Sequence, residues 1–481
     1  MLEPLIKEQS VNSSEEAIAH LSESKFFSLW SYPNIYRDEN ISQKGSGHEM
    51  CDLFVVCGDT AIIISDKSHE FVIRRGLDVA WNSWYKKSIF SSAKQLFGCF
   101  SWMKQHPHRV FTDKHCTSKF PFSLTDIKKF HLIAITDDIK KDKDHVGQFS
   151  YDCNVINGES SNTPFITGNF DKKKPFVHVF NRSLFSLILE NLNTITDFTS
   201  YLYSKEKSIN NGIITHANCE EQILASFLKN RNDNNIVGHL RTSGEPYSFS
   251  DNTWMDYLND NIQSLKFDGN LAFNKLLQLT TDSVVNANVG LGKDQLIEIH
   301  EIALRIIAQE PYISRKILSQ VYLDKFNEVP KNVRSSRLCK SLYFNDLIYV
   351  FLFLPRNTSN LDEYRKQRFL LCSHYATVVK YQNPSVKRVM VIATEPKGYD
   401  IRSEDVVYFD CHEDFDEEDN KNANTISRTL NILTHVNNVE SKGAHVFRGA
   451  SRISKITPKF KRNALCFCGS GKKYKKCCLN K

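Results

Sequence analysis

The chain has 481 residues, of which 41% are hydrophobic and 24% are charged, and its formal net charge is +7. That length exceeds the size at which one hydrophobic core usually stops growing, so two or three folded units are expected. No run approaches the roughly 18 apolar residues of a membrane span and no signal-peptide core opens the chain, which predicts a cytoplasmic protein without a membrane span.

The opening of the chain predicts a helix followed by a β-hairpin. The helix starts with Ser13 or Ser14 as its N-cap and has two acids in its first turn. After the aromatic segment SYPNIYR, two runs rich in Val and Ile occupy 52–56 and 61–65, with CGDT between them. Two such runs around a short polar turn are typical of a hairpin.

Helical spacing returns after the hairpin, and two further strands follow. Bulky side chains recur at helical spacing across 81–103, which predicts one long amphipathic helix. The segments 130–136 and 175–180 are apolar enough for buried strands. Together these elements predict an α/β fold, a mixed sheet with flanking helices.

The rest of the chain divides by pattern into further units. Strand and helix signals alternate again from about Leu342 to Thr434. The acidic segment DCHEDFDEED lacks the glycine-centred spacing of a calcium loop, so a solvated loop is expected there, before a helix near ISRTLNIL. The predicted units are an α/β domain at 1–205, a mainly helical region at 206–335, a second α/β unit at 336–440, a basic linker at 441–462 and a small module at 463–481.

Positive charge is concentrated at the end of the chain. From Arg452 to Lys481 there are ten Lys or Arg and no acid, so the preceding 451 residues carry a net charge of −3. A basic tail of this kind attracts nucleic acid, ribosomes or acidic protein surfaces. The charge alone does not choose among these partners.

Four of the thirteen cysteines lie in this tail, within CFCGSGKKYKKCC. Two close pairs of thiolates can surround one zinc ion tetrahedrally, and the glycines between them allow the chain to fold back. The expected ligands are Cys466, Cys468, Cys477 and Cys478. A site closed by four thiolates has no open position for water, which favours a structural zinc over a catalytic one.

The tail resembles the SEC-C motif, a zinc-binding module found at the end of the bacterial preprotein translocase motor and of many unrelated proteins. The four cysteines match its ligand positions, with Cys478 where the family often has His, and Gly469 and Gly471 match the intervening pattern. The resemblance implies a binding module. The phosphate-binding loop of the motor ATPase has no counterpart, because neither CFCGSGKK nor NVGLGKD has the required glycine spacing.

The hairpin carries acids and a lysine at its ends. Cleavage of a phosphodiester needs a cation such as Mg²⁺ held by acids, with a lysine near the attacking water. The hairpin resembles the PD-(D/E)xK restriction-endonuclease-like superfamily: Asp52 matches the first acid and Lys67 the motif lysine. Glu49 stands where some branches place an extra acid, and Gln95 where some add a polar residue from the following helix.

The sequence departs from that superfamily at Ser65, where the motif has Asp or Glu. Three outcomes are open: Glu49 supplies the second carboxylate, a bulge turns Asp66 inward, or the site has lost its metal and only binds. We favour Glu49. The wider pattern also resembles uncharacterised bacterial proteins that carry the same tail, a resemblance that brings no established activity.

Two functions follow as expectations. The first is a metal-dependent nuclease that hydrolyses phosphodiesters, with DNA as the substrate by superfamily analogy. The second is a catalytically inactive, nuclease-like adaptor that binds nucleic acid, a ribosome or a protein partner through the basic zinc tail. Activity with Mg²⁺ distinguishes them.

Overall fold

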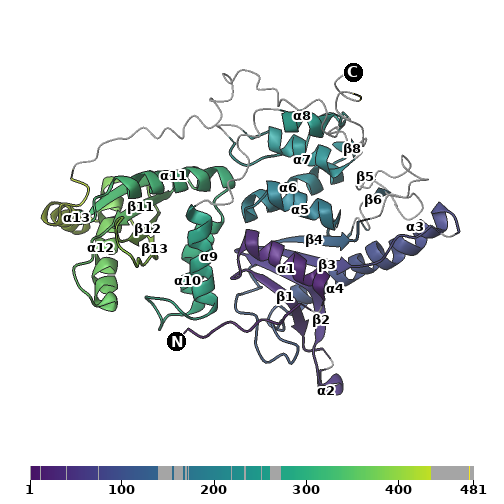
Figure 1. Ribbon diagram of the computed structural model, residues 1–481, viewed down its shortest axis with the longest axis horizontal. Coiled ribbons are helices and arrows are strands. Elements are labelled where there is room, and N and C mark those ends of the chain that lie inside the picture. Colours follow the sequence, from purple (N-terminus) through teal and green to yellow (C-terminus); the bar gives the residue numbers. More distant parts are fainter. Residues whose placement is uncertain are drawn as a thin grey trace. The chain divides into compact units, whose positions relative to one another are not determined.

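The computed structural model has a mixed α/β fold (Figure 1). The chain forms two compact units, Met1–Ser441 and Lys442–Lys481, and the finer division predicted from the sequence stays a prediction. The structure describes residues 2–10, 12–39, 41–73, 75–138, 154–155, 166–167, 171, 173–217, 219–231, 235–250, 252–259, 272–434 and 476.

A five-stranded sheet of order β1-β2-β3-β4-β7 forms the first half of the larger unit. β1, β2 and β3 are antiparallel neighbours, whereas β4 and β7 run parallel to β3. Val, Ile and aromatic side chains dominate these segments, as expected for strands with both faces covered. The strands are β1 (Ser31–Arg37), β2 (His48–Cys57), β3 (Thr60–Lys67), β4 (Lys129–Thr136) and β7 (Val177–Asn181).

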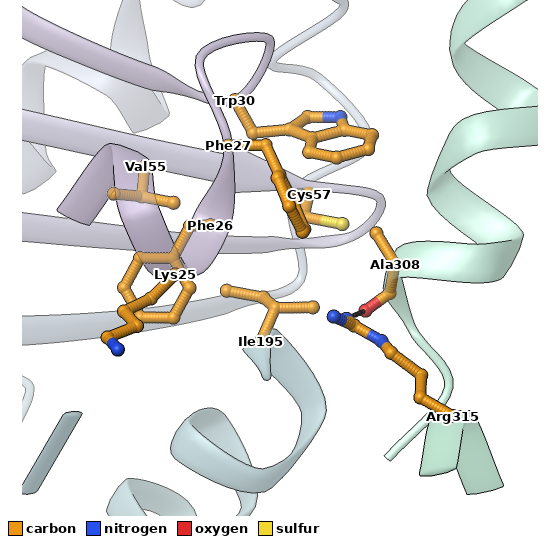
Figure 2. Close-up of a pocket in the computed structure, with 9 residues that line it drawn as sticks. All are labelled: Lys25, Phe26, Phe27, Trp30, Val55, Cys57, Ile195, Ala308 and Arg315. Atoms are coloured by element: carbon orange, nitrogen blue, oxygen red, sulfur yellow. Dashed lines mark hydrogen bonds between the residues drawn. The ribbon is translucent and has the colours of Figure 1, made fainter. Parts of the chain in front are cut away.

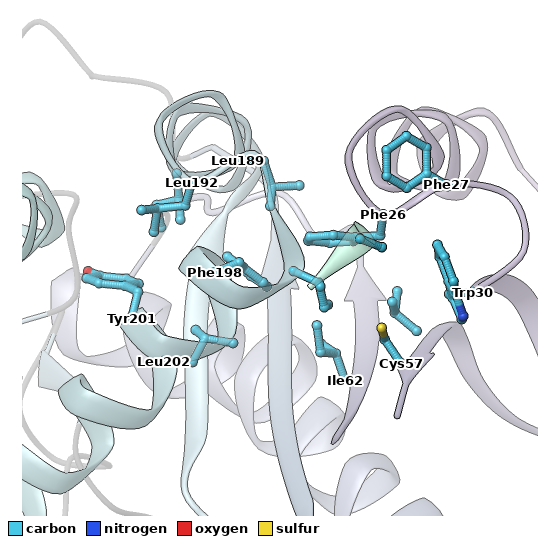
Figure 3. Close-up of a cluster of buried hydrophobic side chains, with 14 of the residues drawn as sticks. Phe26, Phe27, Trp30, Cys57, Ile62, Leu189, Leu192, Phe198, Tyr201 and Leu202 are labelled. Carbon is cyan, nitrogen blue, oxygen red and sulfur yellow. The ribbon is translucent and has the colours of Figure 1, made fainter. Parts of the chain in front are cut away.

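Helices cover both faces of this sheet. Because side chains alternate along a strand, Ile62 and Ile64 join the core beneath α1 (Ser13–Phe26), α5 (Arg182–Asn191) and α6 (Ile195–Asn210). Figure 3 shows Phe26, at the end of α1, beside Leu189 and Phe198 from α5 and α6. Ala61 and Ile63 join the opposite core, against the long helical segment after the hairpin.

That long segment differs in detail from the predicted single helix. It begins as α3 (Leu77–Tyr85), continues as a π-helical turn (Lys86–Phe90) and ends as α4 (Ser91–Gln105). The apolar spacing predicts the buried face correctly, with Trp81, Leu96 and Met103 among the buried residues. A one-turn change of hydrogen bonding inside a helix leaves no mark in such spacing.

The start of the chain corrects one further expectation and adds a strand that was not predicted. The N-cap of α1 is Asn12, whose side chain accepts hydrogen bonds from the backbone N–H groups of Ser14 and Glu15. The aromatic segment that follows is a strand, β1, despite Pro33. Proline is tolerated there because β1 lies at the edge of the sheet, with β2 as its neighbouring strand and an isolated bridge from Tyr36 to Phe111 as a further pairing.

The second sheet has the order β10-β11-β12-β13 and also packs on both faces. Ile348 and Val350 contact the core beneath α12 and α13, whereas Tyr349 and Phe351 join the same core as the first sheet. The elements are β10 (Ser335–Lys340), β11 (Leu347–Phe353), α12 (Leu361–Gln382), β12 (Arg388–Thr394), β13 (Asp405–Asp410) and α13 (Glu417–Leu430).

The acidic segment after β13 contains the start of a helix. α13 begins at Glu417, well before the predicted helix, and Asp416 and Asp419 cap each other's backbone in a capping box. Acids are favourable in the first turn of a helix, where unpaired N–H groups carry partial positive charge. Part of the expected solvated loop is therefore helix.

The helical middle and several short elements complete the described chain. The elements are α2 (Ile41–Lys44), β5 (Asn154–Val155), β6 (Ile166–Thr167), β8 (Ile214–His216), α7 (Glu220–Lys229), β9 (Tyr247–Ser248), α8 (Thr253–Asn259), α9 (Ala272–Val285), α10 (Ile297–Ala308) and α11 (Tyr312–Glu328). Within the described residues, no helix is both long enough and apolar enough to cross a membrane.

Candidate functional site

The hairpin of β2 and β3 brings the acid and the lysine of the predicted motif together. Its strands pair from Leu53↔Ile64 to Cys57↔Thr60, so Asp52 and Lys67 lie at the same open end. The Lys67 Nζ is 4.0 Å from the Asp52 Oδ2. The Asp52 side chain is only 5% exposed and the Lys67 side chain 31%, so their charges interact with reduced screening from water.

Asp52 is also held by the backbone of the neighbouring strand. The N–H of Asp66 donates a hydrogen bond to the Asp52 Oδ2, the same oxygen that faces Lys67. One backbone donor and one lysine therefore orient the Asp52 carboxylate. Hydrogen bonding of this kind fixes a carboxylate in place before any ligand arrives.

A β-bulge determines the position of Glu49. In a regular strand, residues 49 and 52 point to opposite faces because they are three apart. The pairing with β1 steps from Ile35↔Cys51 directly to Tyr36↔Glu49, so Met50 is an extra residue in β2. An extra residue bends the strand and shifts its alternation, which accounts for the contact between the Glu49 and Asp52 side chains.

The surroundings of Glu49 disfavour its negative charge. Burial, the nearby charge of Asp52 and a hydrogen bond between the two carboxyl groups together raise the pKa of Glu49 to about 7, with burial the largest cause. Glu15, on α1, adds to the increase, whereas Lys67 opposes it. Two carboxyl groups in contact, of which Glu49 has a raised pKa, form a site that a bound cation would stabilise. We call Glu49, Asp52 and Lys67 the carboxylate–lysine cluster.

Asp66 has a different set of partners. Arg182 Nη2 donates to its Oδ1 at 2.6 Å, and the Ser14 hydroxyl donates to its Oδ2. Arg182 also pairs with Asp137. The side chain of Asp66 thus joins β3 to α1 and α5, and only its backbone N–H contacts Asp52.

Ser65 and Gln95 contact each other on the face of β3 that lies opposite the side chain of Asp66. The fully buried Ser65 hydroxyl donates to the Gln95 Oε1 at 3.0 Å, and it also contacts Ser92, both on α4. The Gln95 Nε2 reaches the backbone carbonyl of Met50 at 3.5 Å. Gln95 is therefore brought to the bulged residue, and no hydrogen bond found among the described residues joins it to Glu49 or Asp52.

Three contributors to the site could not be read from the sequence. Glu15, Ser14 and Arg182 reach the hairpin from α1 and α5, which are far from it along the chain. None belongs to a recognisable motif. The two acids in the first turn of α1 predict a helix start. Nothing in that signal indicates that Glu15 also acts on the pKa of Glu49.

A small pocket elsewhere in the larger unit lacks this chemistry. Figure 2 shows its walls, formed largely by apolar side chains such as Phe26, Phe27 and Ile195, with Arg315 donating to the carbonyl of Ala308. Among the described residues that line it, none is an acid or a histidine. The carboxylate–lysine cluster is thus separate from this pocket.

The four predicted zinc ligands, Cys466, Cys468, Cys477 and Cys478, lie outside the described residues. Comparison with known families supports the motif itself: residues 462–480 match the SEC-C motif. That match covers a small part of the chain.

Comparison with known proteins gives one further likeness. The chain is 27% identical over 128 residues to the protein translocase subunit SecA of Borrelia garinii subsp. bavariensis. The aligned part is 27% of this chain and spans only 12% of that SecA. No solved structure matches the chain significantly.

Proposed function

We propose that the chain is a Mg²⁺-dependent nuclease that hydrolyses phosphodiesters, with DNA as the expected substrate. The observation that supports the proposal is the carboxylate–lysine cluster, in which Glu49 contacts Asp52 and Lys67 Nζ is 4.0 Å from Asp52. Two carboxylates beside a lysine are the groups that cation-assisted phosphodiester cleavage requires.

The donors of the cluster suit Mg²⁺. Magnesium prefers oxygen ligands and commonly uses one or two carboxylates, with waters and substrate phosphate completing its shell. Glu49 and Asp52 would hold the ion, whose chemistry is to neutralise phosphate charge and acidify a bound water. Lys67 orients the attacking water or the phosphate, and the Asp66 backbone N–H keeps Asp52 in position.

The tail has a separate role in this proposal. Cys466, Cys468, Cys477 and Cys478 bind one structural zinc ion in the SEC-C motif, and the surrounding lysines increase attraction to nucleic acid or to an acidic partner surface. Zinc in the tail and magnesium at the hairpin are chemically distinct, because thiolates select zinc and carboxylates select magnesium.

The proposal is tested with purified full-length protein and duplex or single-stranded DNA. Wild type is expected to cut with Mg²⁺ and to lose cutting when Mg²⁺ is chelated. Asp52→Asn and Lys67→Met are expected to reduce the rate by at least about 100-fold, the scale of losing a charged catalytic group. Asp59→Asn is the matched control, because Asp59 lies at the turn end of the same hairpin.

The second candidate, an inactive adaptor, is favoured by one observation. Ser65 occupies the position of the motif acid and is fully buried against α4, so it adds no charge to the cluster. Binding of DNA without cleavage under every divalent cation tried would favour the adaptor. Equal cleavage by wild type, Asp52→Asn and Lys67→Met would contradict the proposed active site.

A further inference from the structure

Two buried histidines lie on neighbouring strands, on the sheet face covered by α5 and α6. His178 pairs in register with Ile133, two residues beyond His131, and strand alternation places His131 on the same face as Ile133. Ile133 and Phe180 belong to the core beneath these helices. The two imidazole rings therefore point toward the same helical layer, with centroids 6.3 Å apart.

A carboxylate from α6 completes the group. Glu206 is four residues after Leu202 and three before Ile209, both of which are buried in the core under α6. Residues at these spacings share one face of a helix, so Glu206 is directed toward the sheet. One ligand atom from each of His131, His178 and Glu206 lies within 4.8 Å of the others. We call these residues the His–Glu cluster.

The histidines have unmet hydrogen-bonding capacity. They are 2% and 1% exposed, and none of their four ring nitrogens has a hydrogen-bond partner among the described residues. Buried polar groups are nearly always paired, because leaving one unpaired costs free energy. Two adjacent rings with this property indicate a missing ligand more strongly than one would.

The charged groups around the cluster do not oppose the binding of a cation. Lys205, the buried cation next to it, donates to both carboxylate oxygens of Glu220 at 2.6 Å and is already neutralised.

We propose that His131, His178 and Glu206 bind a divalent transition-metal ion, for which zinc is the best fit. Two imidazoles and one carboxylate suit zinc and its neighbours, whereas magnesium prefers oxygen ligands alone. Ligands at about 2.0–2.2 Å from zinc stand roughly 3.4 Å apart in a tetrahedron, so ligand atoms that lie within 4.8 Å of one another must close by at most about 1.4 Å. The flexible side chain of Glu206 and small rotations of the two imidazole rings can supply that movement.

The ion would fasten α6 to β4 and β7. Its three protein ligands come from three separate elements, and a water can occupy the fourth position. This role is independent of the proposed nuclease chemistry, because neither Asp52 nor Lys67 takes part in it.

The test uses the full-length chain with Cys466, Cys468, Cys477 and Cys478 changed to Ser, which removes the tail as a zinc site. After chelation and dialysis, this protein is expected to take up about one equivalent of Zn²⁺. Cobalt in place of zinc is expected to give visible d–d bands without the near-ultraviolet thiolate charge-transfer bands of a cysteine site. Absence of uptake would overturn the proposal.

Variants in the same background identify the ligands. Glu206→Gln preserves shape at a half-buried position. It is expected to weaken zinc binding by more than about 10- to 100-fold, because that is the loss for an outer-shell contact and Glu206 is a direct ligand in the proposal. His178→Asn is expected to abolish binding. His108→Asn, at an exposed position, and Asp52→Asn are expected to retain the full equivalent.

Thermal unfolding separates loss of the site from loss of the fold. Zinc is expected to raise the unfolding midpoint of the tail-free protein in a concentration-dependent way, because it binds only the folded state. Glu206→Gln is expected to keep its far-ultraviolet circular dichroism and lose this rise. Retention of the rise in Glu206→Gln would contradict the assignment.

Discussion

Three acids of one hairpin have three different environments. Asp66 is neutralised by Arg182, and Asp52 is held by a backbone N–H and Lys67. Glu49 instead faces other acids and has a raised pKa. At the scale of the residue, the three carboxylates therefore differ because their neighbours differ. The Asp66 side chain links elements of the fold, whereas Glu49 and Asp52 remain available to a cation.

The raised pKa of Glu49 predicts how stability depends on pH. The folded state holds this proton up to about pH 7, whereas the ordinary pKa of the group is 4.5, so stability contributed by Glu49 falls as pH rises between these values. Glu49→Gln is expected to stabilise the protein by about 1 kcal/mol well above pH 7, because partial exposure screens the full effect. Below pH 4.5 the two proteins should have equal stability.

Urea unfolding across this pH range measures the difference, and Mg²⁺ provides its control. The cation is expected to stabilise wild type above pH 7 and to leave Glu49→Gln nearly unchanged, since a bound cation removes the repulsion. A constant difference between the two proteins at every pH would contradict the assigned cause.

At the scale of the element, the bulge in β2 sets the geometry of the cluster. Met50 adds one residue opposite β1, and Gln95 contacts its carbonyl from α4. Bulges are common where a strand must redirect a functional side chain. The spacing of Glu49 and Asp52 would otherwise separate them.

Insertion of one alanine after Met50 is expected to turn Glu49 away from Asp52, because the bulge already absorbs one extra residue and a second one reverses the alternation. Cleavage and Mg²⁺-dependent stabilisation should then be lost while circular dichroism is retained. Deletion of Met50 is the matched control: it leaves Glu49 two residues before Asp52, on the same face of a regular strand, and should keep both properties. Equal Mg²⁺ responses in the insertion and in wild type would show that alternation along β2 does not position Glu49.

The sequence predicted the hairpin and placed Asp52 and Lys67 at its ends, because alternation and turn residues are local signals. It did not predict that β1 is a strand, since its aromatic residues and Pro33 obscure the pattern. The bulge was not predicted, because Met50 is an ordinary strand residue and does not stand out in the sequence. Glu15, Arg182 and the His–Glu cluster depend on contacts between distant segments, which no local pattern reports.

At the scale of the whole molecule, both large sheets share a core. Side chains from β3, α6, α10 and β11 belong to one hydrophobic cluster, and Trp30 donates a hydrogen bond to Glu301 across 271 positions of sequence. The helical middle region therefore contributes side chains to the core that both sheets share. The residues after Ser441 form a separate compact unit.

A chain ending at Ser441 is therefore expected to unfold in one cooperative transition, within about 2 °C of the full-length midpoint. It should lose one equivalent of zinc, that of the tail, and retain any zinc held by the His–Glu cluster. Calorimetry and metal analysis measure both. A large drop in the midpoint would show that the tail stabilises the rest of the chain.

The extra residue at Met50 also has a consequence for comparing sequences. A relative that lacks it would carry the acid two residues before the counterpart of Asp52, and a regular strand would still place both acids on one face. In an alignment such a relative shows a single gap beside a matching acid. The pair of acids can therefore be kept with either spacing, three residues with the bulge or two residues without it.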